Sequence, residues 1–432
     1  MLGNMLKVSQ CLRLRAGVRA HHTDSALYLT GRTASYRTNV VVPEIGPLSL
    51  ERVKRNLAAR QLSDQHDLPT LELSQNYVKW FQQEEERALG QFQSSPDSGV
   101  MGKALSDLRA ERWAVEEKVA LATLALPNDL EEDWCKDHDI DIHVQGSPPR
   151  FDFAARCHLE LAGDLLEMSN HSPQAFYLLG SLSRLELDLS NRDQDYLRQC
   201  DLIPFANPDF AKSVVIEGCG VDFFDPKAEF ALEPAQDFQD RQSTQGMHLV
   251  GGASIYPFVS FLCKNVVQAT SALPATFYTS GRRYRPLATF ENRGLFNTQQ
   301  TTAVELFNFS ESHDTMKSQL VFLRDKFIEL YDSLDIHYKV VALSAPKLHT
   351  NESCKLSFQM YSPKLDEYIE VGSIRGHGQY LSERFMLKAV KDNSQDLQNL
   401  YCLSGTVLNI TKVLGCLVEN SQTEGGNFHI AI

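Results

Sequence analysis

Apolar residues recur at alternating intervals of three and four positions along two stretches between residues 69 and 126. The repeating positions of the first stretch are Leu71, Ser74, Val78, Phe81, Glu85, Ala88 and Phe92, and those of the second are Leu105, Leu108, Arg112, Val115, Val119, Ala122 and Leu126. This spacing places each set on one stripe of an α-helix. The segment between them, SSPDSG at 94–99, contains only turn-forming residues. The pattern therefore predicts two long antiparallel helices, preceded by a short helical entry over residues 48–66.

The register of this hairpin follows from folding the chain back at the turn. Such folding pairs apolar residues along the whole length, from Phe92 with Leu105, through Ala88 with Leu108, Phe81 with Val115 and Val78 with Val119, to Leu71 with Leu126. It also places Glu85 opposite Arg112, the only charged residues in the two stripes, which predicts an ion pair that sets the register. At ~1.5 Å per residue each helix would be about 35 Å long, so we expect the hairpin to project as an arm.

Short strand-like and helical stretches alternate irregularly after residue 150. Strand-like runs include SVVIEG (213–218), residues 337–343 and KLSFQMY (355–361), and helical stretches include 313–335 and 403–419. Strands and helices in irregular order, with few βαβ repeats, predict an α+β fold, in which helices flank an antiparallel sheet. The predicted domains are an arm domain at 45–130, a linker at 131–150 and an α+β domain at 151–432. Because the chain lacks GxGxxG and GxxxxGK[ST] motifs, any nucleotide site must use another design.

The first forty residues differ in composition from the rest of the chain. They contain one acid, Asp24, and six basic residues: Lys7, Arg13, Arg15, Arg19, Arg32 and Arg37. An Arg-rich, acid-poor start without a long apolar run predicts a mitochondrial presequence in residues 1–40, the alternative being a disordered basic tail. The whole chain carries a formal charge of −13, so nucleic-acid binding would need a local basic patch. No stretch reaches the ~20 consecutive apolar residues of a membrane span.

Metal and disulfide chemistry find little support in the sequence. The nine cysteines form no CxxC pair, and the thirteen histidines show no HExxH spacing. We therefore predict single buried thiols, no metal site and no bound cofactor.

Five stretches, in their order along the chain, resemble segments of one enzyme family. These stretches are FDFAARCHLELAGDLLEM (151–168), AFYLLGSLSRLELDLSNRDQDYL (175–197), NRGLFNTQQTTAVELF (292–307), EYIEVGSI (367–374) and SGTVLNITKVLGCLVEN (404–420). In this order they are similar to seryl-tRNA synthetases, which are class II aminoacyl-tRNA synthetases. The first two resemble the start of the catalytic domain with its dimer-forming first motif, the third and fifth resemble the second and third motifs, and the fourth resembles the strand before the ATP and serine pocket. The resemblance covers residues from about 45 to 432.

The resemblance implies a site that holds ATP with arginines on its phosphates, carboxylates for Mg²⁺ and a pocket for the amine and hydroxyl of serine. Several of these groups are replaced here. The family pattern Phe-Arg-x-Glu reads Tyr284-Arg285-Pro286-Leu287, so the arginine remains and the carboxylate is lost. Asn297 takes the place of a phosphate-facing arginine, and Lys412 takes the place of an arginine that grips two phosphate oxygens at once.

The serine pocket departs from the family pattern as well. The Thr-x-Glu stretch corresponds to Gly252-Ala253-Ser254, whereas Glu305, Glu370 and Ser373 match retained positions. The predicted degenerate adenylation site comprises Ser254, Arg285, Leu287, Asn297, Glu305, Glu370, Ser373 and Lys412, with no catalytic residue. A plainer interpretation makes Glu305 and Glu370 partnered acids within the sheet, and Arg282 and Arg283 part of a solvated loop face.

These losses predict a non-catalytic mitochondrial relative of seryl-tRNA synthetase that binds serine tRNA, partner proteins or both. In this family the arm lies along the long variable arm of serine tRNA. The predicted RNA contacts are Arg87, Lys103, Arg109 and Lys118. The arm also carries nine acids, so a solvated scaffold is the alternative. The first motif implies a homodimer, or a heterodimer with an active mitochondrial seryl-tRNA synthetase. The competing hypotheses are a divergent adenylating enzyme or an active synthetase with an altered substrate, and a purely structural interaction protein.

Overall fold

The computed structural model describes residues 47–430 except 95–97, 170–174, 224, 226, 233–245, 268–271, 287–290, 292 and 392–395, and except the side chains of 47–49, 88, 91–94, 98–105, 113, 114, 117 and 121. The predicted presequence therefore lies outside the described residues, as do Leu287 and the side chain of Lys103. The chain divides into two compact units, Met1–Asp129 and Leu130–Ile432.

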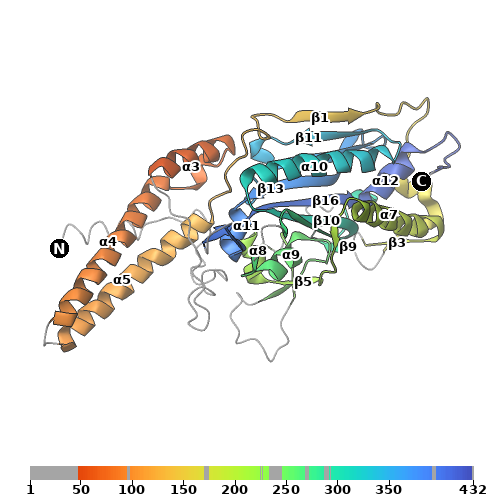
Figure 1. The fold of residues 1–432 in the computed structure, drawn as a ribbon. Helices are drawn as coiled ribbons and strands as arrows, with labels where there is room; N and C mark the ends of the chain where they lie inside the picture. Colours follow the sequence, from red (N-terminus) through yellow and green to blue (C-terminus); the bar gives the residue numbers. More distant parts are fainter. Residues whose placement is uncertain are drawn as a thin grey trace. The chain divides into compact units, whose positions relative to one another are not determined.

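The secondary-structure elements described in the first unit are all helices. Figure 1 shows its two long helices side by side as a hairpin, after a shorter helix and a single 3-10 turn; the elements are α3 (Pro47–Ala59), η1 (Ser63–Gln65), α4 (Leu68–Ser94) and α5 (Ser98–Leu124). Buried residues of the two predicted stripes form one apolar cluster: Leu71, Phe81, Val115, Val119 and Leu126, with Val78, Leu108 and Ala122 packed against it. The predicted helical hairpin and its entry helix are confirmed.

A buried carboxylate fixes the register of the hairpin. Glu85 on α4 accepts hydrogen bonds from Arg112 Nη1 at 2.5 Å and from Arg109 Nε at 2.6 Å, both on α5. The predicted pairing of Glu85 with Arg112 is confirmed, and Arg109 joins it. Because Glu85 is almost entirely buried, a shift of the two helices would leave its charge without these partners.

The second unit is built on an eight-stranded sheet with the order β1-β11-β12-β13-β16-β10-β9-β4. All neighbours are antiparallel except β4 and β9, which are parallel. The strands are β1 (Ile140–Gln145), β4 (Ile203–Pro204), β9 (Ala275–Tyr284), β10 (Gln300–Ser310), β11 (Tyr338–Ala342), β12 (Cys354–Ser362), β13 (Glu367–Gly378) and β16 (Tyr401–Asn409). With its flanking helices, this sheet confirms the predicted α+β class.

Three small sheets complete the described strands of this unit. Their strands are β2 (Leu166–Met168) with β3 (Phe176–Leu178), then β5 (Phe210–Lys212), β6 (Phe230–Leu232) and β7 (Met247–Leu249), and finally β8 (Val266–Val267), β14 (Lys388–Val390) and β15 (Leu397–Asn399). The helices are α6 (His158–Ala162), α7 (Gly180–Gln199), α8 (Ser213–Gly218), α9 (Ile255–Leu262), α10 (His313–Asp332), α11 (Tyr380–Phe385) and α12 (Ile410–Asn420), with 3-10 turns η2 (Gly163–Leu165), η6 (Gly294–Phe296) and η7 (Ala345–Lys347).

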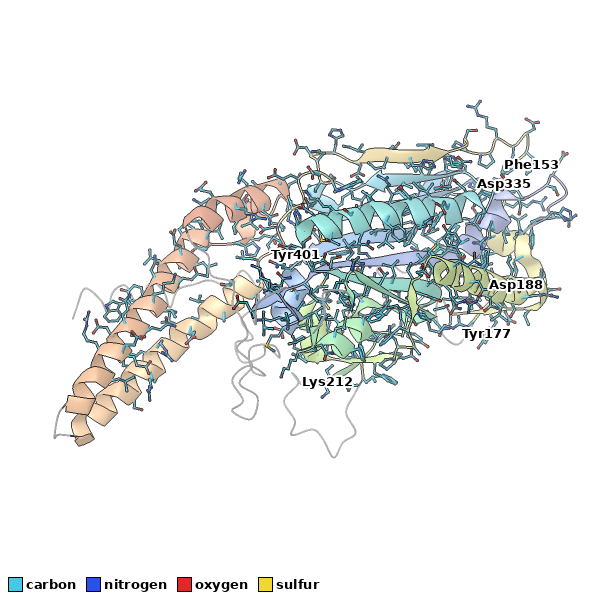
Figure 2. The ribbon with its side chains drawn as sticks, viewed as in Figure 1. Phe153, Tyr177, Asp188, Lys212, Asp335 and Tyr401 are labelled. Atoms are coloured by element: carbon cyan, nitrogen blue, oxygen red, sulfur yellow. The ribbon has the colours of Figure 1, made fainter. Side chains whose placement is uncertain are left out.

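One face of the large sheet carries the main core. Helices α7, α10 and α12 contribute Leu189, Leu320 and Leu414 to a single apolar cluster with sheet residues such as Leu306 and Ile374. Figure 1 shows α10 lying along the large sheet, and Figure 2 adds the side chains, with Asp188 marking α7 and Tyr177 marking β3. Since side chains alternate across a strand, the other face of the same strands can hold polar and charged side chains.

Three sequence predictions differ from this fold. SVVIEG forms helix α8, because a short apolar run has no periodicity that separates helix from strand. Residues 403–409 belong to strand β16, and the helix begins only at residue 410, where the Asn409 side chain accepts a hydrogen bond from Lys412 N at 3.2 Å. The segment 131–150, predicted as a linker, contributes strand β1 to the edge of the large sheet.

Candidate functional site

Polar and charged side chains gather on the face of the large sheet opposite the main core. In β13 the apolar residues Val371 and Ile374 join the core cluster, whereas Glu370 and Arg375 lie outside it. Neighbouring strands also direct apolar side chains to the core and polar ones to the opposite face. The polar set comprises Arg283 (β9), Glu305 (β10), Lys355 and Ser357 (β12), Glu370, Ser373 and Arg375 (β13) and Thr406 (β16). The predicted residues Glu305, Glu370 and Ser373 thus share one face. Glu370 and Ser373 are three positions apart on β13, and the irregularity at Val371, where the pairing with β12 shifts, brings both side chains to the same side of the sheet.

Glu370 is held by two residues of the adjacent strand. Lys355 Nζ lies 2.9 Å from its Oε1, and Ser357 Oγ donates to its Oε2 at 2.7 Å. Burial alone would raise the pKa of Glu370, but Lys355 and Ser357 overcome this effect and lower the pKa to about 2. The carboxylate is therefore ionised at neutral pH, and each of its oxygens already accepts a hydrogen bond from within the chain.

Glu305 is buried in the centre of the sheet and faces Arg375. Arg375 Nη1 lies 3.3 Å from Glu305 Oε1, and Thr406 Oγ1 donates to Glu305 Oε2 at 2.7 Å. The same guanidinium contacts Thr406 Oγ1 through Nη2 at 3.1 Å and Glu352 Oε1 through Nε at 3.5 Å. Burial by itself would lower the pKa of Arg375, whereas Glu305, Glu352 and Glu370 raise it above its ordinary value. The plainer interpretation of Glu305 and Glu370 as partnered acids within the sheet is confirmed.

The arginine cluster before the second motif divides between the two faces of β9. Arg283 points to the polar face, where its Nη1 lies 3.3 Å from Thr406 Oγ1 and 4.0 Å from Glu305 Oε2. Burial, followed by repulsion from Arg285, lowers the pKa of Arg283 to about 10. Arg282 points to the opposite face and pairs with Glu186 of α7 at 3.2 Å. The prediction of a solvated loop face is wrong in placing these two residues in a loop, because both lie in a paired strand. Arg282 is nevertheless exposed to solvent, whereas Arg283 is largely buried.

Lys412 and Ser373 lie at the same site but differ in their hydrogen bonding. Lys412 Nζ donates to the backbone oxygen of Glu370 at 3.2 Å, and burial lowers the pKa of this lysine. Ser373 is fully buried, and its Oγ has no hydrogen-bond partner among the residues that the structure describes. The ammonium of Lys412 is a single point of charge, so it does not present the two-pronged donor set of a guanidinium.

The Gly251–Ser254 segment packs directly on β9. Gly251 has φ +84°, and a Cβ on it would come within 2.1 Å of the Arg282 backbone oxygen, so only glycine fits this approach. Ala253 N donates to the same oxygen at 3.1 Å. The hydroxyl of Ser254 is used locally, since it donates to Gly251 O at 2.7 Å. Ser254 therefore closes a turn within its own segment.

The remaining predicted residues lie at the margin of the site. Arg285 follows the end of β9 and is exposed, with its backbone N bonded to Gln299 O at 2.9 Å. Asn297 donates through Nδ2 to Glu291 O at 3.0 Å. Of the three arginines in the RRYR sequence, Arg283 is the one that the fold brings together with Glu305.

Sequence reasoning missed four charged residues of this face: Lys355, Glu352, Arg375 and Glu229. Glu229 accepts a hydrogen bond from Tyr256 Oη at 2.6 Å, and burial raises its pKa against the opposing effect of Arg285. The signal that could have found Lys355 and Arg375 is a basic residue inside an otherwise apolar strand, as in KLSFQMY and EYIEVGSIR. Such a residue needs a buried partner.

Comparison with known proteins is consistent with this architecture. The sequence profile of the tRNA synthetase class II core domain (G, H, P, S and T) matches residues 243–421, which include β9, β10, β13, β16 and α12. The serine–tRNA synthetase-like protein Slimp of Drosophila melanogaster is 26% identical over 250 residues, which are 57% of this chain and 52% of Slimp. The mitochondrial serine–tRNA ligase of Mus musculus is 25% identical over 344 residues, which are 75% of this chain and 63% of that ligase.

The chain is thus similar in sequence to seryl-tRNA synthetases and matches the class II core domain over residues 243–421. It spans about half of Slimp and less than two thirds of the mouse ligase. Among solved structures, the cytoplasmic serine–tRNA ligase of Naegleria fowleri in complex with AMP has a TM-score of 0.76 at 17% identity, with 90% of this chain and 95% of that chain covered. The seryl-tRNA synthetase of Pyrococcus horikoshii complexed with ATP has a TM-score of 0.74 at 17% identity, with 89% and 94% covered. At this identity the two structures establish the fold.

Two negative findings apply to the residues that the structure describes. None of their helices is both long and apolar enough to cross a membrane. No three or more of their His, Cys, Asp and Glu side chains form a group that could hold a metal ion.

Proposed function

We propose that this seryl-tRNA synthetase-like chain does not activate serine. The observation that carries the proposal is the internal pairing of the acids on the polar face: Glu370 with Lys355, and Glu305 with Arg375. Activation of an amino acid needs carboxylates that are open to Mg²⁺ and to the substrate ammonium, together with arginines that are open to phosphate oxygens. Here these charges are directed at one another.

The pattern of lost groups supports the same proposal. Ser254 is occupied within its own turn, Asn297 is bonded to a loop carbonyl, and Lys412 contacts a backbone oxygen of β13. A site that recognises its substrate through buried hydrogen bonds loses a factor of roughly 10⁴ to 10⁵ when such a contact is missing. Loss of several contacts at once removes useful activation.

We further propose that the arm binds serine tRNA through its backbone. Arg87 is an exposed residue of α4 that pairs with Glu84 of its own helix at 2.6 Å, and Lys118 lies on α5. Arg109 shares Glu85 with Arg112, so part of its charge is already used inside the hairpin. We therefore expect Arg87 and Lys118 to contribute more to RNA binding than Arg109, with Lys103 as the fourth contact.

Calorimetric titration of the chain tests both parts of the proposal. With Mg·ATP we expect no saturable heat, and with serine tRNA we expect saturable binding that weakens as salt rises. Alanine at Arg87, Lys103, Arg109 and Lys118 together should abolish tRNA binding and flatten its salt dependence. A matched variant with alanine at the helix-entry residues Arg52, Lys54 and Arg55 should bind as the parent chain does. Tight ATP binding would favour a divergent adenylating enzyme, and absence of both ligands would favour a structural interaction protein.

We also propose a mitochondrial location and self-association, or pairing with an active mitochondrial seryl-tRNA synthetase. The first forty residues support the location by composition. Exposed apolar side chains support the association, because Tyr177 of β3 and Leu179 and Leu187 at α7 are 60%, 46% and 61% exposed within the first class motif. Sedimentation analysis of the chain, alone and with that enzyme, tests the pairing, and a monomer in both experiments would remove it.

A further inference from the structure

A guanidinium of the chain itself occupies the most acidic position of the candidate site. Arg375 lies between two carboxylates that are each only 1% exposed, Glu305 at 3.3 Å and Glu352 at 3.5 Å. Its third nitrogen donates to Thr406 Oγ1 at 3.1 Å. All three nitrogens of the guanidinium thus face an acceptor, which is the arrangement a site provides for a bound cation.

The position matters because a substrate ammonium needs such a carboxylate. Glu305 lies on the central strand β10 and is flanked by Arg283, whose Nη1 is 4.0 Å away. Its Oε1 faces Arg375, and its Oε2 accepts from Thr406. An ammonium group that approached Oε1 would meet the Arg375 guanidinium already in contact with that oxygen, and repulsion between the two cations would weaken its binding.

Strand β13 directs the Arg375 side chain to the polar face of the sheet. Arg375 alternates with Ile374, a fully buried core residue, and precedes Gly376, where a Cβ would come within 2.7 Å of both Cys354 Sγ and Ser353 Oγ. Strand β13 is therefore pressed closely against β12 at this point. Only 13% of the Arg375 side chain is exposed.

We propose that Arg375 is a built-in plug, a guanidinium that fills the ammonium position of the amino-acid pocket and excludes a free amino acid from Glu305. The inference rests on the proposed loss of serine activation and names the residue that closes the amino-acid side of the site. It assigns Arg375 a positioning and excluding role, separate from the loss of phosphate contacts at Asn297 and Lys412.

The plug can be removed without leaving an excess of buried negative charge. The double variant Arg375→Ser with Glu352→Gln deletes one positive and one negative charge together, and leaves Glu305 facing the vacated space with Arg283 still beside it. The single variant Glu352→Gln keeps the plug and serves as the matched control. Arg282→Ser, which removes an arginine from the other face of the same sheet, controls for loss of an arginine as such.

The test is binding of two small cations, methylguanidinium, which copies the lost head group, and L-serinamide, which carries a primary ammonium. Thermal shift and calorimetry should show saturable binding of both to the double variant with a dissociation constant of the order of 1 mM. The parent chain, Glu352→Gln and Arg282→Ser should bind at least ~10-fold more weakly, a difference of about 1.4 kcal/mol.

Each outcome of this experiment bears on the plug. A double variant that is folded and binds neither compound contradicts the proposal, as does saturable binding of L-serinamide to the parent chain. If the double variant unfolds, recovery of folded protein on addition of methylguanidinium supports the plug, and no recovery counts against it. Serine-dependent pyrophosphate exchange by the parent chain would instead refute the proposed function, so the two failures are distinguishable.

Discussion

Lys355 Nζ lies 2.9 Å from Glu370 Oε1, and this pair joins strands β12 and β13 on the polar face of the sheet. Directly beside it, Lys412 Nζ contacts the backbone oxygen of Glu370. Glu370, which matches a retained position of seryl-tRNA synthetases, is thus bonded to other residues of the fold. The same shift from ligand binding to internal bonding applies to Glu305.

Lys355→Met should destabilise the second unit, because it leaves the Glu370 carboxylate without its cation. We expect a loss of about 1–3 kcal/mol at pH 7, measured by urea unfolding. The pKa of Glu370 is held low at about 2, so its contribution is present above its unfolded value of 4.5 and is lost as pH falls through about 2. The variant should therefore differ most from the parent above pH 5. Lys364→Met, on an exposed turn, is the control and should change stability by less than about 0.5 kcal/mol.

Asp193→Asn should have the opposite pH dependence. Asp193 is fully buried on α7, its Oδ1 accepts from Arg192, and its Oδ2 has no hydrogen-bond partner among the described residues. Burial raises its pKa to about 6 despite Arg192. For a carboxyl group with a raised pKa, stability is full below the unfolded value of 3.8 and is lost as pH rises through about 6.

The asparagine variant removes this ionisation, so it should gain up to about 3 kcal/mol over the parent at pH 8 relative to pH 4. Urea midpoints at the two pH values measure the difference. Asp188→Asn on the exposed side of the same helix should show no such trend. Equal effects of Asp193→Asn at pH 4 and pH 8 would contradict the account of its burial.

Glu85→Gln should loosen the arm. The carboxylate accepts from both Arg109 and Arg112, so its neutralisation leaves two guanidinium groups facing a neutral amide. We expect a local loss of about 1–3 kcal/mol, seen as faster amide hydrogen exchange in α4 and α5 with little change in the large sheet. Glu86→Gln, on the exposed side of α4, should leave exchange unchanged. Equal protection in both variants would show that apolar packing alone sets the register.

The sequence predicted the parts of this fold that have a clear period. The three-and-four spacing in residues 69–126 gave the hairpin and the Glu85–Arg112 pair, because helix geometry fixes which residues face each other. Short apolar runs were less informative, and SVVIEG and residues 403–409 were assigned to the wrong element type. Their structure depends on the residues that pack on them, which a single run does not contain.

The sequence predicted where the candidate site lies but identified only some of its residues. Resemblance located Glu305, Glu370 and Ser373, and strand pairing together with the irregularity at Val371 in β13 brings them to one face. Only the structure shows that Arg283, Arg375 and Lys355 surround these acids, because strand pairing joins residues as far apart in the chain as 305 and 375. Their positive charges balance the negative charges of Glu305 and Glu370, which the resemblance had identified.

Serine-dependent exchange of pyrophosphate into ATP is the most direct measurement of the central claim, that this chain keeps a synthetase fold without serine activation. The purified chain should give a rate equal to the background without enzyme, under conditions in which an active seryl-tRNA synthetase gives steady exchange. The same result should hold with serine tRNA present. Exchange that depends on serine and rises in proportion to the amount of this chain would contradict the account.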